Sequence, residues 1–244
     1  GVSSEGTLDP HINYTARYWP LFNWTHDGLM AFKKVGGAES ANVVPDLAEE
    51  MPELSNDGKT YTFKLRKGIK FSNGKDLTVE DVVASFQRIF KVSSPTSGSF
   101  YSGIVGADKC LAKAETCTLE GGVIADAASN TITINLVAPD AEFLYKLAVP
   151  HAAIVPADTV MKDAGNQPVP GTGSYAFESY DPNASLIMVR NEYFQEWSAD
   201  AQPKWYPDRI EYTFGGTEEA AGNAILTGQA DFMYEPVPSD RLAE

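Results

Sequence analysis

Hydrophobic and polar residues alternate with a period of two in several separate stretches of the chain. Between 60 and 66, Tyr61, Phe63 and Leu65 alternate with polar residues, directly after a turn signal at 56–58. This period is typical of a strand with one buried face. The same reasoning predicts paired strands at 121–126 and 130–139, a hairpin over 171–191 that turns at 181–183, and a strand at 208–215.

A second period, of three to four residues, predicts a helix after Thr78. Val82, Phe86 and Ile89 recur at that spacing and would lie on one buried face. Thr78 is a typical N-cap residue, and the acidic side chains at 80 and 81 favour the positive first turn of a helix. We therefore expect the helix to begin directly after Thr78.

Four further segments complete the expected order of elements. Residues 26–32 read as a helix end and a short strand with a turn at Gly28, and Pro139-Asp140 predicts the start of a helix through Leu147. We also expect a buried strand and then a helix start within 152–160. Residues 217–236 predict a helix, a stop at Gly228 and a short strand. Because strands and helices alternate, the expected fold class is mixed, α/β or α+β.

The formal net charge of −14 argues against two classes of partner. A protein face that binds nucleic acid needs basic residues that replace the counterions on phosphates, and a face that docks on an anionic membrane also needs basic residues. The apolar runs are far shorter than the roughly 20 residues that cross a bilayer. The chain opens with GVSSEGTLDP, without a basic and then apolar leader, so either the protein is cytoplasmic or its leader has been removed.

The two cysteines, Cys110 and Cys117, favour an oxidising compartment. Their spacing is not the C-x-x-C of a redox or zinc site, and no histidine lies near them in the sequence. They predict a local disulfide, which would stabilise the fold by about 2.5 kcal/mol on the chain-entropy account. The alternative is two unrelated free thiols.

No catalytic, metal-binding or cofactor-binding pattern appears in the sequence. His11, His26 and His151 are too scattered to predict a metal site, and G-x-S-x-G and H-E-x-x-H are absent. The glycines at 171 and 173 lack the rest of a phosphate loop and precede a predicted strand rather than a helix. We therefore expect no metal, no cofactor and no enzymatic activity, with a secreted hydrolase as the alternative that enzyme assays would test.

Five stretches, in order along the chain, resemble the family 5 extracellular solute-binding proteins, which are the dipeptide, oligopeptide and nickel binders of ABC importers. The most specific stretch is VVPDLAEEMPELSNDGKTYTFKLRKGIKFSNGKDLTVEDVVASFQRI, at 43–89. The region 112–118 is similar to that of actinobacterial members. The other stretches are TLDP at 7–10, APDAEFLYKLAVPHAAIVP at 138–156, PVPGTGSYAFESYDPNASLIMVRNEYF at 168–194 and AAGNAILTGQADFMYEPVP at 220–238.

The resemblance implies one lobe of a protein with a periplasmic-binding-protein type II-like fold. Family members have two lobes around a cleft, and this chain would hold most of lobe I and none of lobe II. Residues 1–38 and 168–244 would form the ligand-facing subdomain of lobe I. Residues 39–167 would form an inserted outer subdomain that carries the cysteine pair.

The resemblance and the aromatic content together predict the solute-binding residues. The segment after the LDP element passes along the cleft wall in the family, and binding residues often lie on loops such as SGSFYSG at 97–103. For each candidate the alternative is a structural role in the core or hinge. The candidate ligand-binding residues are Tyr14, Thr15, Ala16, Tyr18, Trp19, Phe100, Tyr101, His151, Tyr234 and Glu235.

The function implied is that of a monomeric substrate-binding component of an ABC importer. It would capture an extracellular solute in the cleft and deliver it to the membrane permease subunits. We expect a peptide, with a nickel chelate or an oligosaccharide as open alternatives, and an extracytoplasmic location, either periplasmic or as a cell-surface lipoprotein. A sensor of the same fold is the alternative that shares this site.

Overall fold

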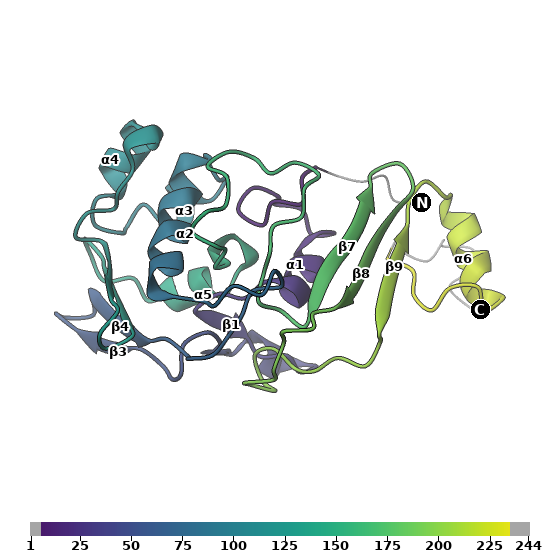
Figure 1. Ribbon diagram of the computed structural model, residues 1–244, viewed down its shortest axis with the longest axis horizontal. Coiled ribbons are helices and arrows are strands. Elements are labelled where there is room, and N and C mark those ends of the chain that lie inside the picture. The colour runs from purple at the N-terminus through teal and green to yellow at the C-terminus, as the bar shows by residue number, and fades with distance from the viewer. Residues whose placement is uncertain (1–5, 235–244) are drawn as a thin grey trace.

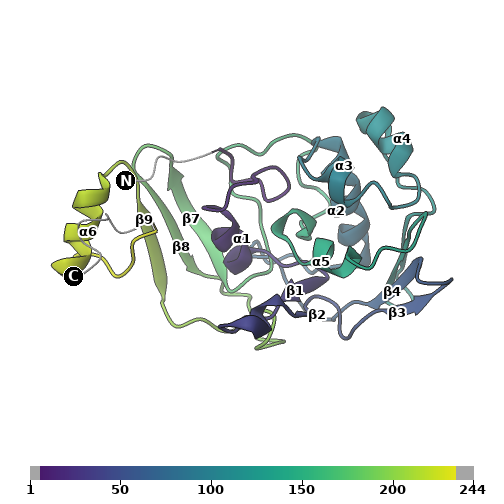
Figure 2. The ribbon, with the colours of Figure 1, turned by 180° about the vertical axis from the view of Figure 1, so that it is seen from behind.

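The computed structural model describes residues 6–234 and is elongated, with a β-sheet toward each end (Figure 1). A four-stranded sheet and helix α2 (Val79–Lys91) lie toward one end, and a three-stranded sheet and helix α6 (Glu218–Leu226) lie toward the other. Helix α1 (Trp19–Thr25) and the short strand pair β1 (Met30–Phe32) and β2 (Val43–Pro45) lie between them, as the reverse view in Figure 2 also shows.

The four-stranded sheet confirms the period-two predictions in the middle of the chain. Its order is β3-β4-β6-β5, and every neighbouring pair is antiparallel. Tyr61 lies opposite Ile134 and Phe63 opposite Ile132, so the apolar face of each strand turns toward the same core. The strands are β3 (Glu53–Ser55), β4 (Thr60–Lys64), β5 (Val123–Asp126) and β6 (Thr131–Asn135).

Helix α2 covers this sheet and begins where the sequence predicts. Thr78 and Asp81 form a capping box, in which the Asp81 carboxylate accepts hydrogen bonds from the Thr78 main-chain N–H and hydroxyl, at 2.8 and 2.9 Å. Val82, Phe86 and Ile89 are buried against the sheet side of the fold. Local capping and amphipathic spacing therefore agree with the tertiary packing in this element.

The Cys110–Cys117 disulfide is present in the structure and closes a short loop. The two Cα atoms are 4.4 Å apart, and both side chains are buried in the core beside α2. The loop holds the end of helix α4 (Ala107–Ala112) and the 3₁₀ turn η2 (Ala114–Thr116), and both elements contact α2; the short helix α3 (Ser97–Phe100) precedes them.

The three-stranded sheet confirms the hairpin and the following strand. Strands β7 (Tyr175–Asp181), β8 (Ser185–Arg190) and β9 (Arg209–Thr213) pair antiparallel in that order. Helix α1 packs on β7, and the buried side chains form a second core that is separate from the first. Its residues are Leu8, Tyr18, Leu21, Phe22, Tyr175, Leu186, Met188 and Phe214.

The chain crosses between the two cores, and the expected subdomain boundaries stay a prediction. Leu29 and Met30 lie within the range expected for the ligand-facing subdomain, yet they pack in the core of the four-stranded sheet. Gly171 and Gly173 carry the chain back between the cores. A Cβ on Gly173 would lie 2.4 Å from the Trp24 carbonyl oxygen, so this close crossing requires glycine.

Two expected elements are wrong, and a third, the helix that ends at Leu147, begins later than expected. In 152–160, the turn η3 (Pro150–Ala152) leads into irregular chain, because Ile154 donates to the Asp27 carbonyl and Val155 to the Ser85 hydroxyl instead of to a strand. Helix α5 (Phe143–Leu147) begins later than Pro139, since the Asp140 carboxylate holds a turn at Glu142. After α6 no strand follows within the residues described, which end at 234.

Candidate functional site

A buried ion pair fixes the N-terminal segment that carries the first predicted site residues. The Asp9 carboxylate accepts two hydrogen bonds from the Arg88 guanidinium on α2, one of them at 2.8 Å, and a third from the Ala164 N–H at 3.0 Å. Both charged side chains are essentially inaccessible to solvent. Burial is the largest influence and raises the pKa of Asp9, but Arg88 and the other groups around the carboxylate together outweigh it, so the net pKa lies below its usual value.

His11 adds a second tie between the same segment and the core. Its Nε2 lies 2.8 Å from the Ala153 carbonyl oxygen, which can only accept, so Nε2 carries the proton and Nδ1 is left to accept from Arg88. Burial lowers the pKa of His11 to about 4, so the ring is neutral at pH 7. Asp9, His11 and Arg88 therefore hold the chain rigidly just before Tyr14.

The segment after this anchor presents an aromatic surface, which we call the Tyr14 wall and define as Tyr14, Ala16, Trp19 and Tyr234. Tyr14 is 52% exposed, and its ring meets the edge of Trp19 with centroids 5.2 Å apart. The Tyr234 hydroxyl donates to the Ala16 carbonyl oxygen at 2.6 Å. The structure thus brings together candidates that lie more than 200 positions apart in the sequence.

Two further residues, the predicted Thr15 and the unpredicted Phe232, lie next to members of the Tyr14 wall and differ in exposure. Thr15 is half-buried, and both its N–H and its hydroxyl donate to the Asn13 side-chain oxygen, at 3.1 and 2.8 Å. Phe232, 72% exposed, lies beside Tyr234 with ring centroids 6.4 Å apart, and the sequence did not single it out. Glu235, which the sequence predicts as a site residue, lies outside the described residues.

Three of the predicted ligand contacts have buried side chains, so in this structure they offer no accessible surface to a solute. Tyr101 is inaccessible and its hydroxyl donates to the Lys146 carbonyl oxygen at 2.9 Å, while burial raises its pKa. Tyr18 packs in the second core with its hydroxyl 2.9 Å from that of Tyr180. His151 is fully buried behind Tyr14. Phe100 is half-buried against the first core, and its contact with solute stays a prediction.

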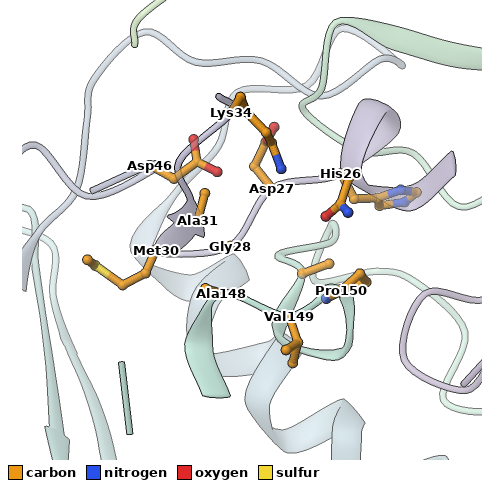
Figure 3. A pocket seen from close by; sticks show the side chains of 12 residues that line it. His26, Asp27, Gly28, Met30, Ala31, Lys34, Asp46, Ala148, Val149 and Pro150 are labelled. Atoms are coloured by element: carbon orange, nitrogen blue, oxygen red, sulfur yellow. The ribbon is translucent and has the colours of Figure 1, made fainter. Parts of the chain in front are cut away.

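A second polar cluster lies between the two cores and was not predicted. Figure 3 shows Asp27, Asp46 and Lys34 around a small cavity whose other side is formed by Ala148, Val149 and Pro150. The cavity measures about 20 Å³, room for a single water. Neither this cavity nor a larger one lined by Thr25, Ser72, Asn73, 168–171 and 175–177 includes a predicted solute-binding residue.

The buried carboxyls of this cluster link segments from both cores. Asp27 accepts hydrogen bonds from the Thr172 hydroxyl and the Gln202 amide, each at 2.6 Å. Asp46 accepts one from the Trp197 indole at 2.9 Å. Burial and the neighbouring Asp27 raise the pKa of Asp46 well above its usual value, and burial lowers the pKa of Lys34. A proton on Asp46 would relieve the repulsion between the two carboxyls.

The described residues offer no arrangement for two other classes of site. Within 6–234, no three histidine, cysteine, aspartate or glutamate side chains gather so that they could hold a metal ion. Over the same residues, no helix has the length and apolar character that would carry it across a bilayer. The Tyr14 wall is an accessible aromatic surface beside the buried Asp9–Arg88 pair, and it can contact a molecule over an area.

Comparison with known proteins identifies one family. Residues 42–243 match the bacterial extracellular solute-binding proteins, family 5, middle region. The dipeptide-binding protein of Escherichia coli (strain K12) is 34% identical over 191 residues, covering 71% of this chain and 32% of that protein. The dipeptide-binding protein of Pseudomonas aeruginosa is 28% identical over 255 residues, covering 95% of this chain and 42% of that protein.

Solved structures agree with the sequence match. The clavulanic acid biosynthesis oligopeptide binding protein 2 is similar to this chain with a TM-score of 0.79 and 27% identity, over 93% of this chain and 41% of that one. The chain therefore spans less than half the length of the relatives it matches. The expected mixed fold, of the periplasmic-binding-protein type II class, is confirmed.

Proposed function

Because the chain belongs to family 5 of the bacterial extracellular solute-binding proteins, we propose that its Tyr14 wall forms one side of a cleft that captures a peptide. The observation that carries this proposal is the placement of Tyr14, Ala16 and Tyr234 on one accessible surface behind a buried anchor. Rigid aromatic side chains with few rotatable bonds are suited to binding because little conformational freedom is lost on contact.

The main chain of the wall favours a peptide over a purely apolar solute. Within residues 6–234, the N–H and C=O of Tyr14 take part in no hydrogen bond. A peptide offers one donor and one acceptor per residue and could pair with both groups, as extended peptides do when they bind along exposed main chain. The relatives named as dipeptide-binding and oligopeptide-binding proteins support the same solute class.

The mechanism we propose is capture and delivery without the making or breaking of a covalent bond. A second lobe would close over the wall and bury the solute, and the closed form would be recognised by the membrane subunits of an ABC importer. Under this proposal the ligand-facing subdomain is 1–38 with 168–244, the outer subdomain is 39–167, and the protein works outside the cytoplasm as a monomer. The matched relatives are named as binding proteins, which supports a non-enzymatic role.

Native mass spectrometry of the full-length protein, purified from its own host without refolding, tests this proposal. We expect an added mass that disappears on denaturation and that fragments as a peptide. An added mass with the isotope pattern of a metal chelate or the fragmentation of a sugar would refute the peptide proposal. Protein that is isolated empty and takes up no member of a tripeptide library would refute it as well.

A further inference from the structure

His151 is the most constrained side chain behind the Tyr14 wall. It lies in the turn η3 and is fully buried, with both ring nitrogens hydrogen-bonded. The Nε2 atom is 3.0 Å from the Asn13 carbonyl oxygen, and Nδ1 is 2.8 Å from the Thr96 hydroxyl. The ring therefore joins the segment that carries Tyr14 to the start of α3.

The partners of His151 fix its tautomer. A carbonyl oxygen can only accept, so Nε2 must carry the proton that bonds Asn13. Nδ1 then accepts from the Thr96 hydroxyl, whose oxygen lies 3.2 Å from that of Ser94. Burial lowers the pKa of His151, which keeps the ring neutral at pH 7. The imidazole is thus a fixed bridge with one donating side and one accepting side.

The same ring supports the aromatic surface from behind. The Tyr14 ring is tilted against His151 with centroids 5.1 Å apart, and Trp19 meets His151 at 6.1 Å and a steep angle of 73°. Because Tyr14 and Trp19 also contact each other, the three rings form a closed triangle. Only Tyr14 in this triangle is largely exposed, so His151 can affect a solute only through its neighbours.

We propose that His151 is a positioning residue, which touches no solute but sets the place of Tyr14 in the binding wall through its hydrogen bond to the Asn13 carbonyl. This inference rests on the proposed peptide-binding function. It differs from a direct ligand contact in one consequence: replacement of His151 should matter only while Tyr14 is present. A residue that acts through another shows such non-additivity when both are changed.

The test measures affinity for an equimolar tripeptide library, and then for its tightest member, with full-length protein by isothermal titration calorimetry. H151L should weaken binding about tenfold, since it removes the bond that holds the Asn13 carbonyl. H151Q should stay within about threefold of the wild type, because its amide can donate to the same carbonyl. In a Y14A background, H151L should weaken binding less than about twofold further.

A matched control separates positioning from general loss of packing. His26 is also buried, but its ring contacts Phe22 and Phe177 instead of Tyr14, so H26L should lower stability without changing affinity. An H151L effect of equal size with and without Tyr14, or an H26L effect as large as that of H151L, would overturn the proposal. A wild-type protein that binds none of the library would instead count against the proposed function.

A measurement without solute tests the positioning itself. Nitrogen-15 spectra of the histidine rings, assigned by comparison with H151Q, should show His151 as the Nε2-protonated tautomer, and H151L should shift the Tyr14 ring resonances. If His151 carried its proton on Nδ1, or if the Tyr14 resonances stayed in place in H151L, the proposal would be wrong whether or not a peptide binds.

Discussion

Arg88 and Asp9 form an ion pair that is shielded from solvent, with side-chain exposures of 1% and 0%. Arg88 belongs to α2 and Asp9 to the segment that leads to Tyr14, so the pair joins the first core to the start of the Tyr14 wall. Arg88 also donates to the Val160 and Lys162 carbonyls. The buried guanidinium charge is stabilised because the Asp9 carboxylate, the His11 Nδ1 atom and these two carbonyls all accept hydrogen bonds from it.

Replacement of Asp9 by asparagine should therefore destabilise the fold strongly. The substitution leaves the buried Arg88 charge without its counter-charge, for which we expect a loss of about 3–5 kcal/mol in the free energy of unfolding. Urea denaturation at pH 7 measures this loss. The matched control is D76N, which removes the exposed partner of Lys70 and should cost less than about 1 kcal/mol. Equal effects of the two substitutions would show that the buried pair is not a structural anchor.

The Asp27–Asp46 cluster predicts that stability falls as the pH rises. Because the pKa of Asp46 is raised in the folded protein, the fold binds a proton more tightly than the unfolded chain does. Its contribution is fully present below the unfolded pKa of about 4 and is lost as the pH rises through the folded pKa. Lys34 faces the same cavity and reduces this effect without abolishing it.

The substitution D46N should remove that pH dependence. Asparagine is neutral at every pH and keeps an oxygen for the Trp197 indole, so we expect D46N to be more stable than the wild type at pH 8, and this stability difference should grow as the pH rises from 4 to 8. Thermal melts from pH 4 to pH 8 measure the difference. D208N, at a carboxylate that is 95% exposed, is the control and should leave the profile unchanged. If the melting temperature changed between pH 4 and pH 8 by the same amount in the wild type and in D46N, this assignment would be contradicted.

The disulfide should contribute measurably to stability. It closes a loop with a sequence separation of 7, for which the chain-entropy account gives about 2–3 kcal/mol. Replacing both cysteines by serine should lower the urea midpoint accordingly, and dithiothreitol should lower the wild-type midpoint by a similar amount. If the reductant destabilised the double variant as much as the wild type, the effect would not come from this bond.

Tyr101 should matter for stability and not for binding. Y101F removes the hydrogen bond that the Tyr101 hydroxyl donates to the Lys146 carbonyl, which should cost about 1 kcal/mol. Because the side chain is inaccessible, peptide affinity measured by calorimetry should stay unchanged. A large loss of affinity in Y101F, with stability intact, would restore the direct ligand contact that the sequence suggests.

Tyr61 and Tyr101 show what the sequence could predict and what it could not. Elements specified by neighbouring residues, such as the capping box at Thr78 and the alternation of Tyr61 and Phe63, are as expected. Tyr101 lies in a serine- and glycine-rich loop, which suggests exposure, but long-range packing against Phe86 buries it. Side-chain burial depends on contacts between distant segments, and local composition does not encode them.

The failure over 152–160 and the missed carboxyl cluster have the same physical origin. The main chain at Val155 bonds a side chain on α2 instead of a strand, and no local period predicts such a partner. Asp27 and Asp46 each lie shortly after a helix or strand, in an ordinary loop sequence. Their pKa values are raised only because the folded chain buries both carboxyls. The sequence analysis predicted the aromatic members of the Tyr14 wall but not the buried hydrogen bonds that position them.

Tyr14 is the central solute contact in the proposed function, and calorimetric titration of the full-length protein with its tightest-binding tripeptide tests that contact. Y14A should weaken binding at least tenfold with little change in the urea midpoint, because the side chain is 52% exposed. Tyr145, which is 48% exposed and lies on α5, supplies the matched control. We expect Y145A to bind the tripeptide as tightly as the wild type does, and equal affinities of Y14A, Y145A and the wild type would contradict a solute contact at Tyr14.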